Sequence, residues 1–402
     1  MPPVVSSEHF LDSVAQQVNA GTFMAELMTN KQKEYNSASP CDSSSPAPLP
    51  LPRLTIMEYL GASKFGHHKD VLDFDSFELL PELQPLDLLI EVKYAELNPV
   101  DLQKLNAKNG QEVPNPPLIV GYGGSGLVNQ VGSGLSSDEW SGKRVCFLCD
   151  STRPGSYATH VAVDYRCVAV VPFELSLEDA ATVPLAGCTA YESVLKLNMT
   201  DERTLLVVGA AGGAGSWALL LARARYPSMN IIATAGSEAS RMWCTQMGAT
   251  HVIPHNDIAN LGGGPKGSVD YVLCLTEPTK EVFAALAEVI KPYGSICLVV
   301  AGNSIQSLDC GFLFFKAVTL TFETVFTSSR TNFDMIVPAK EITDILMHLQ
   351  DRTIPAIPIS PQQKLFNSLD WRECLQDGGL LDQIASGHTQ GKLVMKVEAS
   401  PD

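Results

Sequence analysis

Twenty residues near the middle of the chain, 205–224 with the sequence LLVVGAAGGAGSWALLLARA, restrict its fold more than any other stretch. A short apolar run meets a cluster of glycines and then small and apolar residues, a pattern typical of a buried strand, a tight turn and a helix. Here Gly212 would let the backbone approach a pyrophosphate, and Gly215 would let the helix pack closely on the strand. Ala210 replaces the first glycine of the usual fingerprint. The pattern, A-x-G-x-x-G, predicts the phosphate end of a dinucleotide site.

A transmembrane helix is the alternative for this stretch, because no residue between Arg203 and Arg223 is charged and a span needs roughly 20 apolar residues. The downstream pattern favours the dinucleotide fold. Further strands are predicted at 230–235, 251–253, 269–275, 295–300 and 318–323, with helices reaching residues 247 and 290. Six strands alternating with helices predict a doubly wound parallel sheet of the Rossmann type, and the transmembrane interpretation is rejected.

Length and charge exclude several classes of function. A chain of 402 residues exceeds what one core usually holds, so two domains are expected. The formal net charge of -16 argues against binding to nucleic acid or to an anionic membrane by general attraction. The ten cysteines are scattered rather than spaced as a framework, which fits free thiols in a reducing compartment, the cytoplasm.

The chain divides into four segments. Residues 1–52 are predicted to be a disordered extension with a proline- and serine-rich linker and a transient helix at 8–28. Residues 53–175 form a β-rich domain of short strands, 176–327 form the Rossmann domain, and 328–402 return to the first domain through a strand at 391–397. In the β-rich part, the run 88–102 is expected to break into a turn at Asn98-Pro99.

The end of the second Rossmann strand usually selects the cofactor. An acidic residue there would bind a ribose hydroxyl, but this strand ends in Ala-Gly-Ser, with Ser237 and, one turn on, Arg241. A small polar loop and an arginine suit a 2′-phosphate, which favours NADPH over NADH. Glu238 counts against this, because its carboxylate can repel that phosphate.

The chain resembles the medium-chain dehydrogenase/reductase superfamily, and within it the zinc-independent quinone oxidoreductases and the proteins labelled zinc-type alcohol dehydrogenase-like. The matching motifs are LNPVD (97–101), VGYGGSG (120–126), GSYATHVAV (155–163), VPLAGCTAYESV (183–194), the glycine turn, YGSICLVVAG (293–302), TLTFETVFTSSRTNFDM (319–335) and GKLVMKV (391–397). The resemblance spans residues 53–397. It implies a GroES-like β-rich catalytic domain beside a Rossmann domain.

The departures from the family concern zinc. Where zinc-dependent members carry their three catalytic ligands, this chain aligns Asn98, Tyr122 and Leu185. A catalytic zinc needs three protein ligands from cysteine, histidine or carboxylate, so no metal is expected. Cys146 and Cys149 are two thiols where a structural zinc needs four ligands, and buried packing is the favoured interpretation.

The resemblance places Asn98, Asp101 and Thr189 near the nicotinamide. Asn98 would donate an amide N–H to a developing oxyanion, and Thr189 would hold the carboxamide or the substrate. Asp101 is equally well explained as a cap of the turn after Pro99. Tyr122 is either a hydrogen-bond donor to the substrate or an aromatic side chain that fills the space taken by zinc in zinc-dependent members. The residues predicted to bind the cofactor are Ala210, Ala211, Gly212, Gly213, Ala214, Gly215, Ser237, Arg241 and Thr189.

Two further features have structural explanations. Cys188 is expected to be a buried thiol, and His67 and His68 are expected to lie on the surface.

Together these features predict a zinc-free, NADPH-dependent reductase of quinones or α,β-unsaturated carbonyl compounds. Without a Lewis acid the acceptor must be easy to reduce, and both classes are. The alternatives are a trans-acting enoyl reductase of carrier-bound thioesters and a crystallin-like NADPH-binding protein of low turnover. A homodimer is expected, because the apolar strand at 318–322 would otherwise leave an exposed edge.

Overall fold

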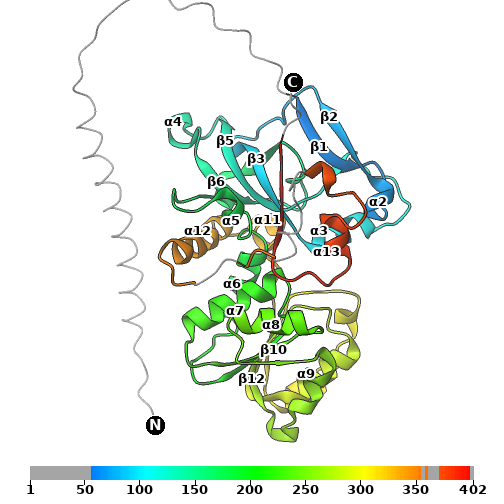
Figure 1. Ribbon diagram of the computed structural model, residues 1–402, viewed down its shortest axis with the longest axis vertical. Helices are drawn as coiled ribbons and strands as arrows, with labels where there is room; N and C mark the ends of the chain where they lie inside the picture. Colours follow the sequence, from blue (N-terminus) through cyan, green and yellow to red (C-terminus); the bar gives the residue numbers. More distant parts are fainter. Residues whose placement is uncertain (1–55, 355–357, 361–370, 399–402) are drawn as a thin grey trace, which may run out of the picture. The chain divides into compact units, whose positions relative to one another are not determined.

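The computed structural model describes residues 56–354, 358–360 and 371–398. The predicted N-terminal extension, 1–52, and its helix at 8–28 lie outside the described residues. The described chain forms a parallel sheet, a second six-stranded sheet and a three-stranded sheet (Figure 1). Among the described residues, no helix has the length and apolar character needed to cross a bilayer.

The parallel sheet confirms the predicted Rossmann fold. Its strand order is β11-β10-β9-β12-β13-β14, and every neighbouring pair is parallel. The strands are β9 (Thr204–Val208), β10 (Asn230–Thr234), β11 (His251–Ile253), β12 (Val269–Cys274), β13 (Ile290–Leu298) and β14 (Thr319–Phe322). Because the order reverses between β9 and β12, a crevice is expected at the carboxyl ends of these two strands.

Helices cover both faces of this sheet, which explains why its strands are apolar throughout. Leu205 and Val207 belong to the core shared with α6 (Ala186–Lys196), α7 (Gly213–Arg225) and α8 (Glu238–Gln246). Leu206 and Val208 point to the other face and pack with α9 (Lys280–Val289) and α10 (Gly311–Phe315). Successive side chains of a strand alternate between faces, so the apolar residues of β9 are buried on both faces of the sheet.

The predicted boundary between α9 and β13 is wrong by several residues. β13 begins at Ile290, where the sequence predicts helix, and not near residue 295. The ammonium of Lys316 donates to the carbonyls of Ala287, Glu288 and Ile290, at 3.0, 2.6 and 2.8 Å. These distant hydrogen bonds satisfy the end of the helix, and no local pattern in the sequence announces them.

The second sheet is built around β3 (Asp87–Leu97), which pairs antiparallel with β5, β7 and β15. Its other strands are β5 (Gly123–Val131), β6 (Arg144–Leu148), β7 (His160–Asp164), β8 (Val168–Val170) and β15 (Leu393–Lys396). A Cβ on Gly123, Gly124 or Gly126 would collide with Glu96, Tyr94 or Glu91 of β3. These glycines therefore serve close packing of β5 on β3.

The small sheet has the order β2-β1-β4. Its strands are β1 (Met57–Ala62), β2 (Leu72–Phe77) and β4 (Leu118–Ile119). The remaining helices are α2 (His68–Val71), α3 (Pro99–Asn106), α4 (Ser137–Trp140), α5 (Leu177–Ala180), α11 (Thr327–Thr331), α12 (Val337–Gln350) and α13 (Leu380–Ala385). Short 3₁₀ turns lie at η1 (Tyr165–Cys167), η2 (His255–Leu261), η3 (Gly264–Lys266), η4 (Ser304–Ser307) and η6 (Trp371–Glu373).

Two local predictions need correction. Pro99 starts the helix α3 rather than a simple turn, because proline is well suited to the first helical position. His68 is buried and not on the surface: its Nε2 lies 3.0 Å from Asp382 Oδ1 of α13. Burial lowers the pKa of His68, although the hydrogen bond to Asp382 opposes this shift.

Candidate active site

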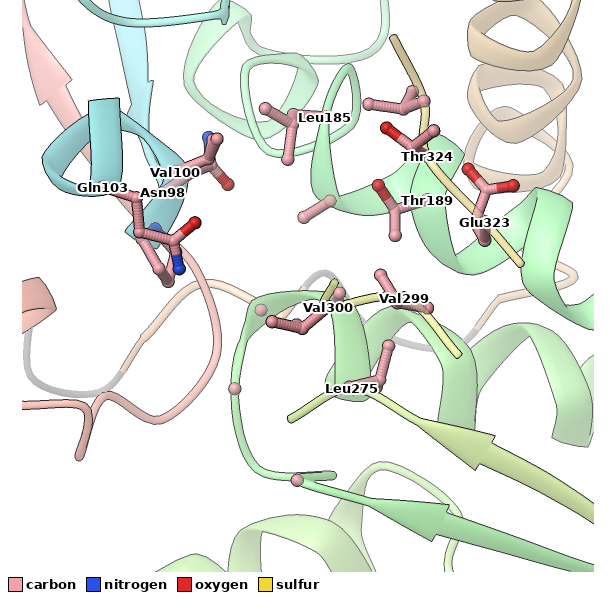
Figure 2. Close-up of a pocket in the computed structure, with 18 of the residues that line it drawn as sticks. Asn98, Val100, Gln103, Leu185, Thr189, Leu275, Val299, Val300, Glu323 and Thr324 are labelled. Carbon is pink, nitrogen blue, oxygen red and sulfur yellow. The ribbon is translucent and has the colours of Figure 1, made fainter. Parts of the chain in front are cut away.

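A cavity of about 780 Å³ lies beyond the carboxyl ends of β12, β13 and β14 (Figure 2). The glycine turn before α7 lines one part of it, and the starts of α3 and α6 line another. Six of the predicted site residues line it: Asn98, Thr189, Gly212, Gly213, Ala214 and Gly215. Among the described residues, the lining does not include Ala210, Ala211, Asp101, Tyr122, Ser237 or Arg241.

The glycine turn fits the phosphates of a dinucleotide. Gly209 has φ +77°, which favours glycine, and Gly212 is the N-cap of α7. A Cβ on Gly215 would lie 2.5 Å from the carbonyl oxygen of Ala210, so this glycine lets the helix pack against the turn. A Cβ on Gly212 would meet only the Gly209 oxygen, at 3.9 Å. The protein itself leaves the space beside Gly212 open, next to the unpaired N–H groups that begin a helix.

The C-terminal segment closes over this turn. The Gly391 N–H donates to the Ala211 carbonyl at 2.8 Å, and Gly212 forms a parallel bridge with Gly391. A Cβ on Gly213 would collide with the side chain of Lys392. Ala211 thus holds the segment that precedes β15. This contact places Lys392, which comes from that segment, beside the glycine turn.

The residues expected at the adenosine end lie beyond the carboxyl end of β10. Ser237 caps α8, since its Oγ accepts from the Ser240 N–H at 3.1 Å. The Arg241 side chain is half-buried in the first turns of α8 and makes no ion pair within the described chain. His255, which the sequence analysis did not single out, lies beside Gly236, and its Nδ1 is 2.8 Å from Thr234 Oγ1.

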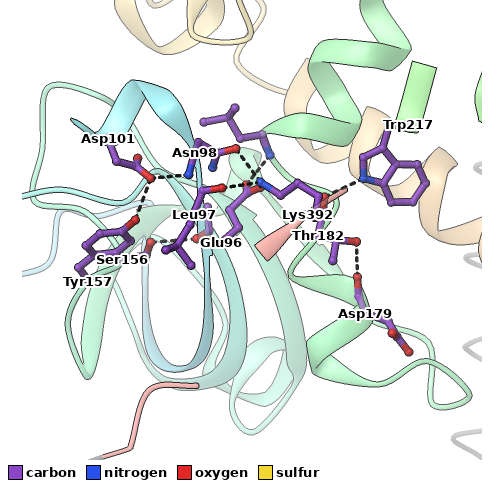
Figure 3. A network of polar contacts seen from close by, with 12 residues as sticks. Glu96, Leu97, Asn98, Asp101, Ser156, Tyr157, Asp179, Thr182, Trp217 and Lys392 are labelled. Atoms are coloured by element: carbon purple, nitrogen blue, oxygen red, sulfur yellow. Dashed lines mark hydrogen bonds and ion pairs between the residues drawn. The ribbon is translucent and has the colours of Figure 1, made fainter. Parts of the chain in front are cut away.

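The amide of Asn98 is held by a buried lysine (Figure 3). Lys392 Nζ donates to Asn98 Oδ1 at 2.6 Å and to the Leu97 carbonyl at 2.9 Å, and it forms an ion pair with Glu96 Oε2 at 2.8 Å. The other oxygen of Glu96 accepts from the Leu185 N–H at 2.6 Å. The Asn98 Nδ2 is buried and meets no hydrogen-bond partner among the described residues. Figure 2 shows the Asn98 side chain pointing from the start of α3 toward the cavity.

Lys392 and Glu96 are functional candidates that the sequence analysis missed. One signal was available: each is a charged residue inside or beside an otherwise apolar strand, in YAEL and GKLVMKV. Charged side chains are almost never fully buried unless they are paired. The identity of the partner, however, does not follow from the sequence.

Asp101 caps α3 from behind the cavity. Its Oδ2 accepts from the Asn98 N–H at 2.8 Å and from the Tyr157 hydroxyl at 2.9 Å, which is the capping arrangement. Its Oδ1 has no partner among the described residues. Burial raises the pKa of Asp101 to about 7, against the opposing effect of these hydrogen bonds.

Tyr122 and Thr189 lie at different depths. The Tyr122 ring is buried and packs edge-on against Phe326, with 5.5 Å between ring centroids. Phe326 lines the cavity and Tyr122 does not, which favours the interpretation of Tyr122 as an aromatic filler. Burial raises the pKa of Tyr122. Thr189, in the first turns of α6, lines the cavity directly (Figure 2).

The donor set does not fit a catalytic zinc. At the three aligned ligand positions, Asn98 offers an amide, Tyr122 a phenol of raised pKa and Leu185 no donor atom. In the described ranges, no three histidine, cysteine or acidic residues are grouped so as to hold a metal ion. Cys146, Cys149 and Cys188 are buried free thiols, and burial raises the pKa of each. They are inert packing residues rather than nucleophiles or ligands.

A carboxylate cluster next to the cavity was also missed. Glu323, directly after β14, forms ion contacts with Lys196 of α6, which also pairs with Glu192 at 2.9 Å. Burial and the neighbouring Glu192 raise the pKa of Glu323 to about 8 and that of Glu341 to about 9. Glu323 is one of the residues that line the cavity (Figure 2), and its side chain is buried.

Comparison with known proteins agrees with this geometry. Residues 84–173 match the alcohol dehydrogenase GroES-like domain. A zinc-type alcohol dehydrogenase-like protein of Staphylococcus aureus (strain COL) is 31% identical over 273 residues, which cover 66% of this chain and 79% of the relative. The chloroplastic NADPH-dependent alkenal/one oxidoreductase of Arabidopsis thaliana is 29% identical over 233 residues, covering 56% and 60% of the two chains.

The fold is also that of a solved structure. The quinone oxidoreductase from Coxiella burnetii superposes with a TM-score of 0.70 at 23% identity, over 86% of this chain and 100% of that chain.

Proposed function

The chain belongs to the medium-chain dehydrogenase/reductase superfamily, and we propose that it is a zinc-free, NADPH-dependent reductase of quinones or α,β-unsaturated carbonyl compounds. One observation carries the proposal. One cavity joins a glycine turn suited to phosphates with the Asn98 amide, a buried donor that has no partner among the described residues, at a position where zinc-dependent relatives need a ligand. The family membership already makes the protein an oxidoreductase.

The local chemistry beyond β10 supports NADPH as the cofactor. When bound, the dinucleotide would supply a hydride from its nicotinamide ring. The N–H groups around Gly212 and Gly213 would hold the pyrophosphate, while Ser237 and Arg241 would meet the 2′-phosphate. The Arabidopsis relative carries NADPH dependence in its name, which agrees with this assignment.

The chemistry of the three aligned ligand positions, Asn98, Tyr122 and Leu185, supports an acceptor that is reduced without a metal. Hydride addition to a quinone or to the β-carbon of an enone leaves negative charge on an oxygen. The Asn98 Nδ2 would donate to that oxygen, and Thr189 would orient the acceptor or the carboxamide. Because Tyr122 lies behind Phe326, we assign proton supply to water rather than to this tyrosine. Nine described cysteines are free thiols, which supports a reducing compartment such as the cytoplasm.

A screen of NADPH oxidation tests the proposal. Purified protein should oxidise NADPH with 9,10-phenanthrenequinone or with trans-2-hexenal, and a chelator should leave the rate unchanged. Turnover confined to enoyl thioesters would replace the acceptor class with that of a carrier-dependent enoyl reductase. Stoichiometric zinc whose removal abolishes turnover would refute the zinc-free assignment, and absence of turnover with every acceptor would favour a binding protein.

A further inference from the structure

The Lys392 ammonium is held inside the protein by three contacts. Lys392 and Glu96 are 2% and 0% exposed, and the ammonium donates to the Leu97 carbonyl and to Asn98 Oδ1 and forms an ion pair with Glu96 Oε2. A lysine ammonium has three protons and no lone pair. Lys392 lines the cavity, and toward each of these groups its ammonium can act only as a donor.

This arrangement decides which way the Asn98 amide points. The oxygen and nitrogen of an amide are hard to distinguish by shape, and their assignment depends on the hydrogen-bond partners. Because Lys392 can only donate, the atom that faces it must be the amide oxygen. The NH₂ group of Asn98 is then turned away from Lys392, and it meets no acceptor among the described residues.

Glu96 makes the buried lysine tolerable and ties it to α6. An unpaired buried charge costs several kcal/mol, and Glu96 compensates it at 2.8 Å. Its second oxygen accepts from the Leu185 N–H at the N-cap of α6, and Gly123 leaves room for the carboxylate because a Cβ there would collide with it. The ion pair thus joins the start of α3, the start of α6 and the segment before β15.

We propose that Lys392 and Glu96 are positioning residues that fix the Asn98 amide with its N–H groups toward the acceptor oxygen and strengthen its donation. The positive charge at the amide oxygen polarises the group and makes its N–H bonds better donors. A preorganised donor of this kind stabilises charge that develops during the reaction. The proposal rests on the proposed reductase function for its catalytic consequence, while the orientation of the amide can be measured without turnover.

A double-mutant cycle tests whether the ion pair acts through Asn98. Glu96→Gln and Lys392→Met are introduced together, so that no buried charge is left unpaired, and Asn98→Ala is the second change. With 9,10-phenanthrenequinone as acceptor, each should lower kcat about tenfold to a hundredfold, and the Kd for NADPH should change less than twofold. The triple variant should lose no more than Asn98→Ala alone. Losses that multiply would overturn the proposal.

Lys316→Met is the matched control for losing a buried lysine. Lys316 is likewise buried, and it donates to three backbone carbonyls near the end of α9. This variant should lower the Tm and leave kcat unchanged. If Lys316→Met and the Glu96→Gln/Lys392→Met variant lower kcat alike, the effect of the ion pair is on stability and the proposal fails.

A second measurement needs neither cofactor nor substrate. The side-chain amide signals of Asn98 in a ¹⁵N–¹H spectrum are identified by their loss in Asn98→Ala. They should shift in the Glu96→Gln/Lys392→Met variant and stay in place in Lys316→Met. Unchanged signals would overturn the inferred orientation even in an active enzyme. Shifted signals in a protein that reduces none of the acceptors would instead uphold the orientation and refute the proposed function.

Discussion

At the scale of single residues, burial decides the protonation of Asp101. The carboxylate is fully buried, and only one of its oxygens is hydrogen-bonded among the described residues. Its pKa is about 7 in the folded protein and 3.8 in an ordinary carboxyl group. The folded state therefore binds more protons than the unfolded state between these two values, so the free energy of unfolding falls as the pH rises through this window.

Asp101→Asn should remove this dependence. The contribution of one group over about three pKa units is on the order of 4 kcal/mol, present at pH 4 and lost above pH 7. An asparagine keeps an acceptor for the Asn98 N–H and carries no charge. Urea unfolding should show the variant gaining stability relative to the parent protein as the pH rises from 5 to 8. A constant difference between the two proteins across this range would contradict the assignment.

Arg241 is the residue on which the cofactor prediction depends. Its side chain makes no ion pair in the described chain, so its replacement by alanine breaks no ion pair there. Arg241→Ala should weaken NADPH binding by about 1 to 3 kcal/mol, the value of a charge-assisted contact with phosphate, and leave NADH binding unchanged. Calorimetric titration measures both. Arg225→Ala, at the exposed end of α7, is the control. Equal loss for both cofactors would rule out a contact with the 2′-phosphate.

At the scale of elements, two glycines of one turn have different purposes. Gly215 has no room for a Cβ, because the Ala210 carbonyl oxygen would lie 2.5 Å away, whereas Gly212 has room and an ordinary φ of -70°. The first glycine is required by the packing of α7 on the turn. The second leaves free the space that a pyrophosphate would occupy.

The two alanine variants should therefore separate folding from binding. Gly215→Ala should lower the Tm by several degrees, because the helix must move away from the turn. Gly212→Ala should lower the Tm less than Gly215→Ala, because its Cβ meets only the Gly209 oxygen at 3.9 Å and the variant loses only the preference for glycine over alanine at an N-cap, and it should weaken NADPH binding at least tenfold. Thermal melts and fluorescence titration measure the two effects. A Gly212→Ala protein that binds NADPH normally would exclude close approach of the phosphates there.

At the scale of the whole molecule, the exposed edge of the parallel sheet supports the expected homodimer. β14 is the last strand in the order of that sheet, and Phe322 at its end is half exposed. In α10, which packs near the same face, Phe314 and Phe315 are 82% and 87% exposed. An open strand edge beside exposed aromatic rings is an association surface, and we propose that a second copy of the chain covers it.

Charge on this surface should dissociate the dimer. Light scattering at micromolar concentration should give the mass of two chains for the parent protein and of one chain for Phe314→Glu/Phe315→Glu. Phe173→Glu introduces a charge at a ring that is 89% exposed in the β-rich part, and this control should remain dimeric. A monomeric parent protein would exclude the dimer.

The sequence by itself determined the Rossmann sheet and its glycine turn. Both depend on local patterns: short apolar runs, regular alternation with helices, and glycines within seven positions of one another, as in Gly209 to Gly215. Such patterns are visible because each element carries its own periodicity and turn chemistry. The family resemblance added Asn98 and Thr189, which line the cavity in the structure, while their catalytic roles stay predictions.

Only the tertiary structure decided how the site is held. Lys392 lies 294 positions from Asn98, and His68 lies 314 positions from Asp382. No periodicity reports such partnerships, because burial and pairing depend on which distant segments the sheets bring together. The same reason explains why Tyr122 lies behind Phe326 and why the pKa of Glu323 is raised. The free energy of a buried charge is set by neighbours in space, whereas the sequence orders only neighbours along the chain.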